Sequence, residues 1–271
     1  MSFVRRHRLL VFFVLAYALA WGPIPWSGFF STGALLAAVI TAVVTEGMPG
    51  LRRIGARLAR WRVAWVWYAV ALAVPLGVSL VAVLLNIALG ASAPSSAFRT
   101  PWYGVPLALG LHLIDPIGGP LTEEASFRGF AQPELQRIRS RLGATAVMAL
   151  LVGGWHGPLL LLDPPQTRPA GFVTAIALTF WYAWLFNHAE ESALLTLLAH
   201  SVEGGGWIHN LWGPGSDRDG SILAYAVVWC LVVLGLLVFD RHFWVHHPAA
   251  DPTAPTVADL AGRAGSGRNP S

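Results

Sequence analysis

The chain has 271 residues, of which 55% are hydrophobic and only 12% are charged, and its formal net charge is +4. Water-soluble domains carry about 25% charged residues, so this composition excludes an ordinary soluble globule. The basic residues are all arginine and stand in short islands between long apolar runs. A nucleic-acid-binding protein would gather its basic residues on one polar face. The sequence therefore predicts a membrane protein with no nucleic-acid partner.

Eight apolar runs follow one another along the chain, and a helix needs roughly 20 such residues to cross a bilayer. Because backbone groups in hydrocarbon must be satisfied within the segment, we expect helices. The predicted fold class is all-α: a polytopic membrane helix bundle of about eight transmembrane helices. Residues 1–247 would form one domain, and the small, polar residues 248–271 a disordered cytoplasmic tail. The runs cover residues 9–27, 29–47, 64–90, 104–136 (interrupted), 142–162, 171–188, 192–210 and 221–240.

The arginines of the connecting segments predict an orientation. With the N-terminus in the cytoplasm, 15 of the 18 arginines fall in inside segments, and only Arg99, Arg168 and Arg218 fall outside. Short cytoplasmic loops of membrane proteins are enriched in arginine and lysine. We therefore expect both termini in the cytoplasm. The all-arginine usage is typical of a GC-rich bacterial genome, so the expected location is a bacterial plasma membrane.

Ionisable residues inside apolar runs are expensive, about 2.5–3.5 kcal/mol each at a helix centre, and therefore mark candidate functional positions. Glu46 lies near the end of a run, beside an arginine-rich loop, and is interpreted as an interfacial residue. His112 and Asp115 precede the break "PIGGP" and either cap broken helix ends or serve a function. The remaining candidates are Glu123, Glu124, His156 and His200.

The segment "TEEASFRGF" carries the most specific pattern. Pro120 can occupy the first turn of the helix that follows the glycine break. Glu124 and Arg128 are i,i+4 neighbours and can pair. Glu123 points about a third of a turn away and is free to face a cavity. The alternative interpretation is a capping carboxylate pair with a surface salt bridge at the membrane edge.

Two histidines lie on separate runs. His156 follows Gly153 and Gly154 in "GGWHG", where small residues let neighbouring helices approach, and it could simply bond a backbone carbonyl. His200 could be a packing residue. Together with a carboxylate, however, two histidines can hold water for a general base and stabilise developing negative charge. The rival motifs HExxH and GxSxG are absent from the sequence.

In this order and spacing the residues resemble the CPBP family of intramembrane glutamic endopeptidases, which are related to the Ras-converting CAAX protease and to Abi proteins. The motifs E-E-x-x-x-R, F-x-x-x-H and H-x-x-x-N are matched in part, over about residues 105–210. The resemblance implies that Glu123 is the general base and that His156 helps to hold the water. It further implies that His200 stabilises the oxyanion, while Glu124 and Arg128 position the helix and the base. It requires no cofactor.

Two positions depart from the family pattern. Val152 stands where the second motif has phenylalanine, which is a packing change. Gly204 stands where the third motif has the asparagine that helps to form the oxyanion hole, and losing one such donor can cost ~100–1000-fold in rate. Asn187, Glu203 and Asn210 are the candidates to compensate.

The predicted function is that of an intramembrane endopeptidase acting on a membrane-associated protein or peptide in the lipid bilayer. One alternative is a non-catalytic membrane protein of the same fold, such as a peptide-binding scaffold or a self-immunity factor. Another is proton-coupled transport through Asp115 and the glutamates. We expect no cofactor, and the alternative is a zinc ion held by Glu123, His156 and His200.

Overall fold

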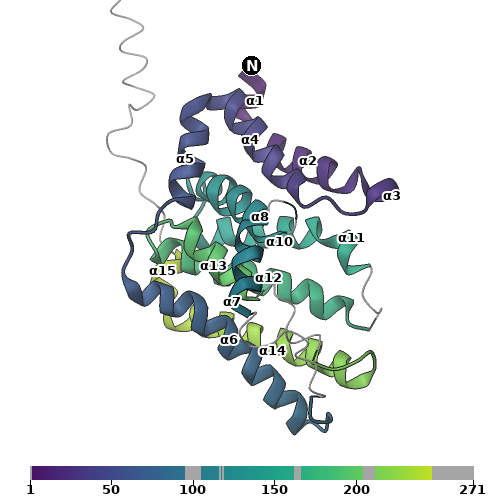
Figure 1. Ribbon diagram of the computed structural model, residues 1–271. Coiled ribbons are helices and arrows are strands. Elements are labelled where there is room, and N and C mark those ends of the chain that lie inside the picture. Colours follow the sequence, from purple (N-terminus) through teal and green to yellow (C-terminus); the bar gives the residue numbers. More distant parts are fainter. Residues whose placement is uncertain are drawn as a thin grey trace, which may run out of the picture.

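The computed structural model describes residues 2–94, 105–115, 117, 119–161, 166–203 and 211–245. All regular secondary structure in these ranges is helical, as the apolar runs predict (Figure 1). The predicted disordered tail, residues 248–271, lies outside the described residues.

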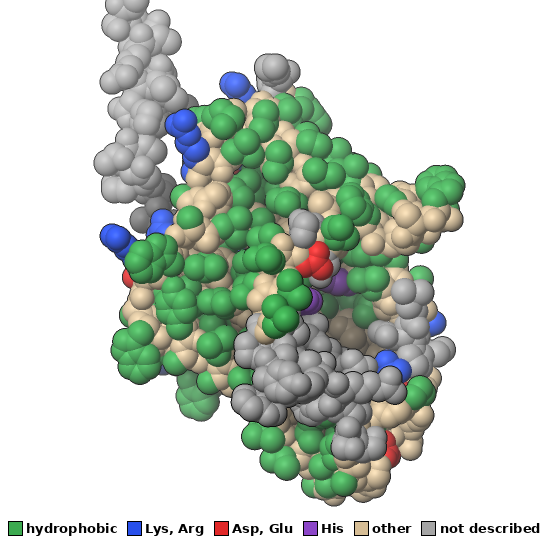
Figure 2. All heavy atoms as spheres, viewed as in Figure 1, with side chains coloured by type: hydrophobic (Ala, Val, Ile, Leu, Met, Phe, Trp, Pro, Cys, Tyr) green, Lys and Arg blue, Asp and Glu red, His purple; other side chains and the backbone are tan. Residues whose placement is uncertain are grey.

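Four segments are long and apolar enough to cross a membrane, and three further apolar helices are shorter. Large hydrophobic side chains are exposed along the long helices, among them Leu80 on one and Leu231 on another, at 60% and 61%. Figure 2 shows that such side chains cover much of one face of the molecule. An exposed apolar surface of this extent is suited to lipid, so the chain is a multi-pass membrane protein; the count of eight spans stays a prediction. The long segments are α2 (Arg8–Trp21) with α3 (Ile24–Ser27), α6 (Trp65–Ala88), α12 (Arg168–His188) and α14 (Ser216–Phe239), and the shorter ones are α4 (Thr32–Glu46), α10 (Arg141–Trp155) and α13 (Ala193–Glu203).

Three runs expected as spans are divided in the structure, among them 9–27, where α2 ends at Trp21 and α3 begins at Ile24. The run 104–136 is interrupted as predicted: α7 ends at Ile114 and the next helix begins at Pro120. The run 142–162 was expected to be continuous, but α10 ends at Trp155 and a short helix follows His156. Pro158 explains the break, because proline lacks an N–H and disfavours helical backbone in the residue before it. The remaining helices are α1 (Ser2–Arg6), α5 (Met48–Leu58), α7 (Val105–Ile114), α8 (Pro120–Ser126), the π-helix η2 (Phe127–Ala131), α9 (Gln132–Gln136), α11 (Gly157–Leu160) and α15 (Arg241–Val245).

The buried hydrophobic side chains form two clusters. The first joins α2, α4, α8 to α10 and η2, and the second joins α6, α12, α13 and α14. Helices α2 and α4 run side by side in Figure 1. Their close approach requires Gly33, where a Cβ would lie 2.8 Å from the backbone nitrogen of Ala20. Helices α8 and α13 contact one another across the two clusters, so this seam is where groups from distant runs meet.

Segments that the sequence assigns to the inside meet at one end of the bundle, here called the arginine-rich end. Arg8 pairs with Glu46 at 3.0 Å and also with Glu134. Arg57 pairs with Glu191 at 3.1 Å, although 134 positions separate them. These ion pairs join α2, α4, α5, α9 and the turn after α12 at one end of the bundle. They also fit the interpretation of Glu46 as interfacial.

Candidate active site

Three of the expected site residues come from the helical segment that runs from α8 through η2. The segment begins after Gly119, whose φ of 112° suits glycine, and Pro120 occupies its first turn as predicted. A π-helix such as η2 is rare and is frequently found at functional sites. Arg57 of α5 donates from Nη1 to the carbonyl of Gly129 in this π-turn at 3.0 Å. The segment is thus held at its irregular turn by the neighbouring helix.

The buried carboxylate of Glu124 accepts hydrogen bonds from two side chains. Its Oε1 accepts from Arg128 Nη1 at 3.2 Å, so the predicted i,i+4 pair is present. The same oxygen accepts from His200 Nδ1 at 2.9 Å, across 76 positions of sequence. Glu124 is 0% exposed and Arg128 2%. This is a buried pair inside the bundle, and the alternative of a surface salt bridge at the membrane edge is wrong.

Tyr182 of α12 completes the surroundings of this pair. The guanidinium carbon of Arg128 lies 4.9 Å from the centre of the Tyr182 ring, which is the distance of a cation–π contact. The His200 ring also stacks on the Tyr182 ring, with 5.1 Å between the ring centres. The hydrogen bond to Glu124 and the stacking on Tyr182 both restrict the orientation of His200.

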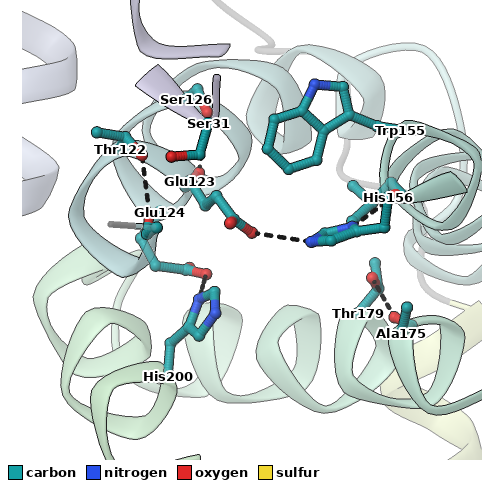
Figure 3. Close-up of polar contacts among 12 residues, drawn as sticks. Ser31, Thr122, Glu123, Glu124, Ser126, Trp155, His156, Ala175, Thr179 and His200 are labelled. Atoms are coloured by element: carbon teal, nitrogen blue, oxygen red, sulfur yellow. Dashed lines mark hydrogen bonds and ion pairs between the residues drawn. The ribbon is translucent and has the colours of Figure 1, made fainter. Parts of the chain in front are cut away.

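Glu123 points away from this pair and toward His156 (Figure 3). Its Oε2 lies 3.5 Å from His156 Nε2. The other ring nitrogen, Nδ1, lies 2.9 Å from the carbonyl oxygen of Val152. Since a carbonyl can only accept, Nδ1 carries the proton. Nε2 is therefore the nitrogen that faces the carboxylate.

The break between α10 and α11 fixes the place of His156. The indole nitrogen of Trp155 donates to the carbonyl of Ala16 at 3.2 Å, and that of Trp21 donates to the carbonyl of Trp155 at 2.9 Å. A Cβ at Gly153 would lie 2.9 Å from Phe172, and one at Gly154 would lie 2.7 Å from the Tyr17 hydroxyl. These two glycines permit close packing, as expected, whereas Gly157 has open space around it.

A cavity of about 300 Å³ lies between α8, α10, α12 and α13. Glu123, Arg128, His156 and His200 line it, while Glu124 lies behind them. Figure 2 shows acidic and histidine side chains at a hollow of an otherwise mostly apolar face. Glu123 lies eleven residues before Glu134 of the arginine-rich end, or about 16 Å of helix rise, so the cavity is in the interior of the bundle.

Asp115 and Asn187, two other candidates from the sequence, do not line this cavity. Asp115 Oδ1 accepts from the backbone N–H of Ile117 at 2.8 Å, which is a capping role at the broken helix end. Asn187 donates to the carbonyl of Ala183 at 2.7 Å and does not line the cavity. Gly204 and Asn210 lie outside the described residues. Glu203 does line the cavity.

Sequence reasoning missed the tyrosines around the cavity. Tyr182 lines it, and Tyr225 of α14 reaches Glu203. Neither stands in a motif, and a tyrosine in an apolar run resembles any other packing residue. Only the meeting of α12, α13 and α14 shows their place.

The described residues contain no group of three or more His, Cys, Asp or Glu side chains arranged to hold a metal ion. Glu123 faces His156, whereas His200 is bonded to Glu124.

Comparison with known proteins identifies the segment that carries the site. The family model described as Rce1-like, type II CAAX prenyl endopeptidase Rce1-like, matches residues 105–203. None of the curated proteins compared with the chain matches it. The matched segment contains all five expected site residues and all of the residues that line the cavity. The resemblance to the CPBP, or CAAX protease, family that the motifs indicate is thereby confirmed over residues 105–203.

Proposed function

We propose that the protein is an intramembrane endopeptidase that hydrolyses a peptide bond of a membrane-associated substrate with water activated by Glu123. The family match supports a membrane peptidase of the CAAX protease type. The observation that carries the finer proposal is the facing pair of Glu123 and His156, 3.5 Å apart in a cavity inside the bundle.

The pair is suited to holding a water molecule. When His156 is neutral, with its proton on Nδ1, its Nε2 presents a lone pair toward Glu123, whose carboxylate is also an acceptor. A water beside them can donate one hydrogen to each. Glu123 takes one of these protons as the water oxygen forms a bond to the scissile carbonyl carbon. A positioned general base of this kind contributes about 10²–10⁴-fold to the rate.

His200 also lines the cavity, and we assign to it the place where negative charge forms on the carbonyl oxygen. In this role its ring carries protons on both nitrogens, with Nδ1–H bonded to Glu124 and Nε2–H directed to the oxyanion. Arg128 neutralises Glu124 and keeps the carboxylate in place. Glu124 and Arg128 would act through His200 and are positioning residues.

Collapse of the tetrahedral intermediate breaks the carbon–nitrogen bond. Protonated Glu123 returns its proton to the departing nitrogen, which leaves as an amine, and the carbonyl side leaves as a carboxylic acid. Water supplies both the new oxygen and the new hydrogen, so the cycle returns Glu123 to its starting state with no other co-reactant.

The test is a comparison of peptide termini in membranes that express the wild type, Glu123→Gln or the control Glu46→Gln. Glu46 lies at the arginine-rich end and is paired with Arg8, away from the cavity. The proposal expects new termini with the wild type and the control but not with Glu123→Gln. Identical termini in all three, with equal protein abundance, would favour the non-catalytic, peptide-binding alternative.

A further inference from the structure

Glu203, at the end of α13, is a second carboxylate in the cavity for which the hydrolytic steps have no task. It lies three residues after His200, and i,i+3 residues share a helix face about 5–6 Å apart. The two side chains therefore line the cavity as neighbours.

Two tyrosine hydroxyls fix this carboxylate. Tyr225 donates to Glu203 Oε1 at 3.0 Å, and Tyr182 donates to Oε2 at 3.4 Å. Both tyrosines are buried, at 2% and 3% exposure. Phenols that donate to both oxygens are suited to an ionised carboxylate, and they hold it against the helices that carry them, α12 and α14.

Among the described residues, the hydrogen bonds to Glu203 come from the two neutral phenols, and the basic side chain that interacts with it electrostatically is His200, whose Nδ1 is already bonded to Glu124. The cationic Arg128 of the cavity is already bonded to Glu124. When His200 is protonated, its charge and that of Arg128 balance two of the three carboxylates Glu123, Glu124 and Glu203, which leaves one negative charge at the cavity. A partly buried charge without an opposite charge is costly, and a cation from the substrate would offset that cost.

We propose that Glu203 is a specificity-determining residue that binds a cationic group, a guanidinium or ammonium, of the substrate next to the scissile bond. The inference rests on the proposed peptidase function and names the substrate class. Since His200 is the expected neighbour of the scissile carbonyl, the cation belongs to a residue one or two positions from that bond. An arginine or lysine side chain and a free amino terminus share this chemistry.

The test measures binding rather than cleavage, so that it does not depend on turnover. Glu123→Gln protein in detergent is titrated with acetylated, amidated nonapeptides of leucine and alanine whose central residue is arginine or its uncharged isostere citrulline. A third peptide has no arginine but a free N-terminus. The expected Kd is about 10- to 100-fold lower for arginine than for citrulline, the range of one hydrogen bond to a charged group. Tight binding of the third peptide would show that the amino terminus is the source of the cation.

The same titration in Glu123→Gln combined with Glu203→Gln should bring the arginine-to-citrulline ratio close to one. Combination with Glu190→Gln, the same change at an exposed position outside the cavity, should leave the ratio unchanged. Two results would overturn the inference. The first is that the arginine peptide binds no better than the citrulline peptide and that the peptide with a free N-terminus is not preferred either. The second is that the arginine-to-citrulline ratio persists in the Glu203→Gln variant. If the double variant does not fold, the peptide comparison in the Glu123→Gln protein alone still tests the inference. Failure of the proposed function would appear separately, as a wild type that produces no new termini.

Discussion

His200 is held by Glu124: its Nδ1 donates to Glu124 Oε1 at 2.9 Å, and the carboxylate that accepts this bond is 0% exposed. Glu123, the adjacent residue, faces His156 instead. Two neighbouring carboxylates on one helix thus serve two histidines on different helices. Glu123 lines the cavity and Glu124 lies behind it.

Removal of Arg128 should destabilise the protein more than removal of an exposed arginine. Arg128→Met leaves Glu124 buried without its cation, and breaking a buried ion pair in this way costs about 3–5 kcal/mol. Arg137, whose side chain is 64% exposed, provides the matched control, because exposed pairs contribute only about 0–1 kcal/mol. Thermal unfolding in detergent measures both variants.

The double variant Glu124→Gln with Arg128→Met should recover part of this loss, since it removes both buried charges. A double variant less stable than Arg128→Met alone would contradict the pairing described for Glu124.

Replacement of His156 should lower turnover more than substrate affinity. His156→Gln keeps a polar side chain but loses the imidazole lone pair that faces Glu123. We expect kcat to fall about 10²–10⁴-fold, the contribution of a positioned acid–base partner, with KM nearly unchanged. Steady-state kinetics on a cleaved peptide distinguish the two parameters. A large rise in KM at constant kcat would instead assign His156 to substrate binding.

Packing of α2 on α4 depends on a glycine. Gly33→Ala would place a Cβ 2.8 Å from the Ala20 backbone, and overpacking of this kind typically costs about 1–3 kcal/mol. The control is Gly77→Ala on α6, where nothing lies within 4 Å of the added Cβ. The thermal unfolding temperature should fall for Gly33→Ala and not for Gly77→Ala. Equal temperatures would show that the two helices separate without loss.

Chelation should leave activity unchanged if glutamate-activated water is the nucleophile. Among the described residues, Glu123 pairs with His156 and Glu124 pairs with His200. No three His, Cys, Asp or Glu side chains of these residues are grouped to hold a metal ion. Peptide cleavage is measured before and after treatment with 1,10-phenanthroline, together with the zinc content of the purified protein. Activity that is lost on chelation and restored by zinc would contradict this expectation.

Much of the fold follows from local patterns that the sequence displays. Apolar runs of the right length predict helices, and proline and glycine at 116–120 predict the break before α8. The break at His156 escaped prediction because a single proline, Pro158, outweighed the apolar character of the run. The π-turn at Gly129 escaped as well, because its support comes from Arg57, which is distant in sequence.

The parts of the site that a motif or a residue spacing specifies could be predicted from the sequence. The i,i+4 relation gives the pair Glu124–Arg128 directly, and the rotation per residue separates Glu123 from it. Which histidine belongs to which carboxylate depends on how α10 and α13 pack on α8. The tyrosines at Glu203 depend likewise on tertiary contacts, and no spacing along the chain encodes them.

The rate at which purified protein cleaves a peptide found in the membrane comparison tests the central claim most directly. Wild type, Glu123→Gln and Glu46→Gln are compared in nanodiscs, with folding checked by thermal unfolding. Glu123→Gln should reduce kcat/KM by at least about 100-fold, as expected for loss of a general base, while Glu46→Gln retains the wild-type value. A folded Glu123→Gln protein that cleaves at the wild-type rate would contradict the account.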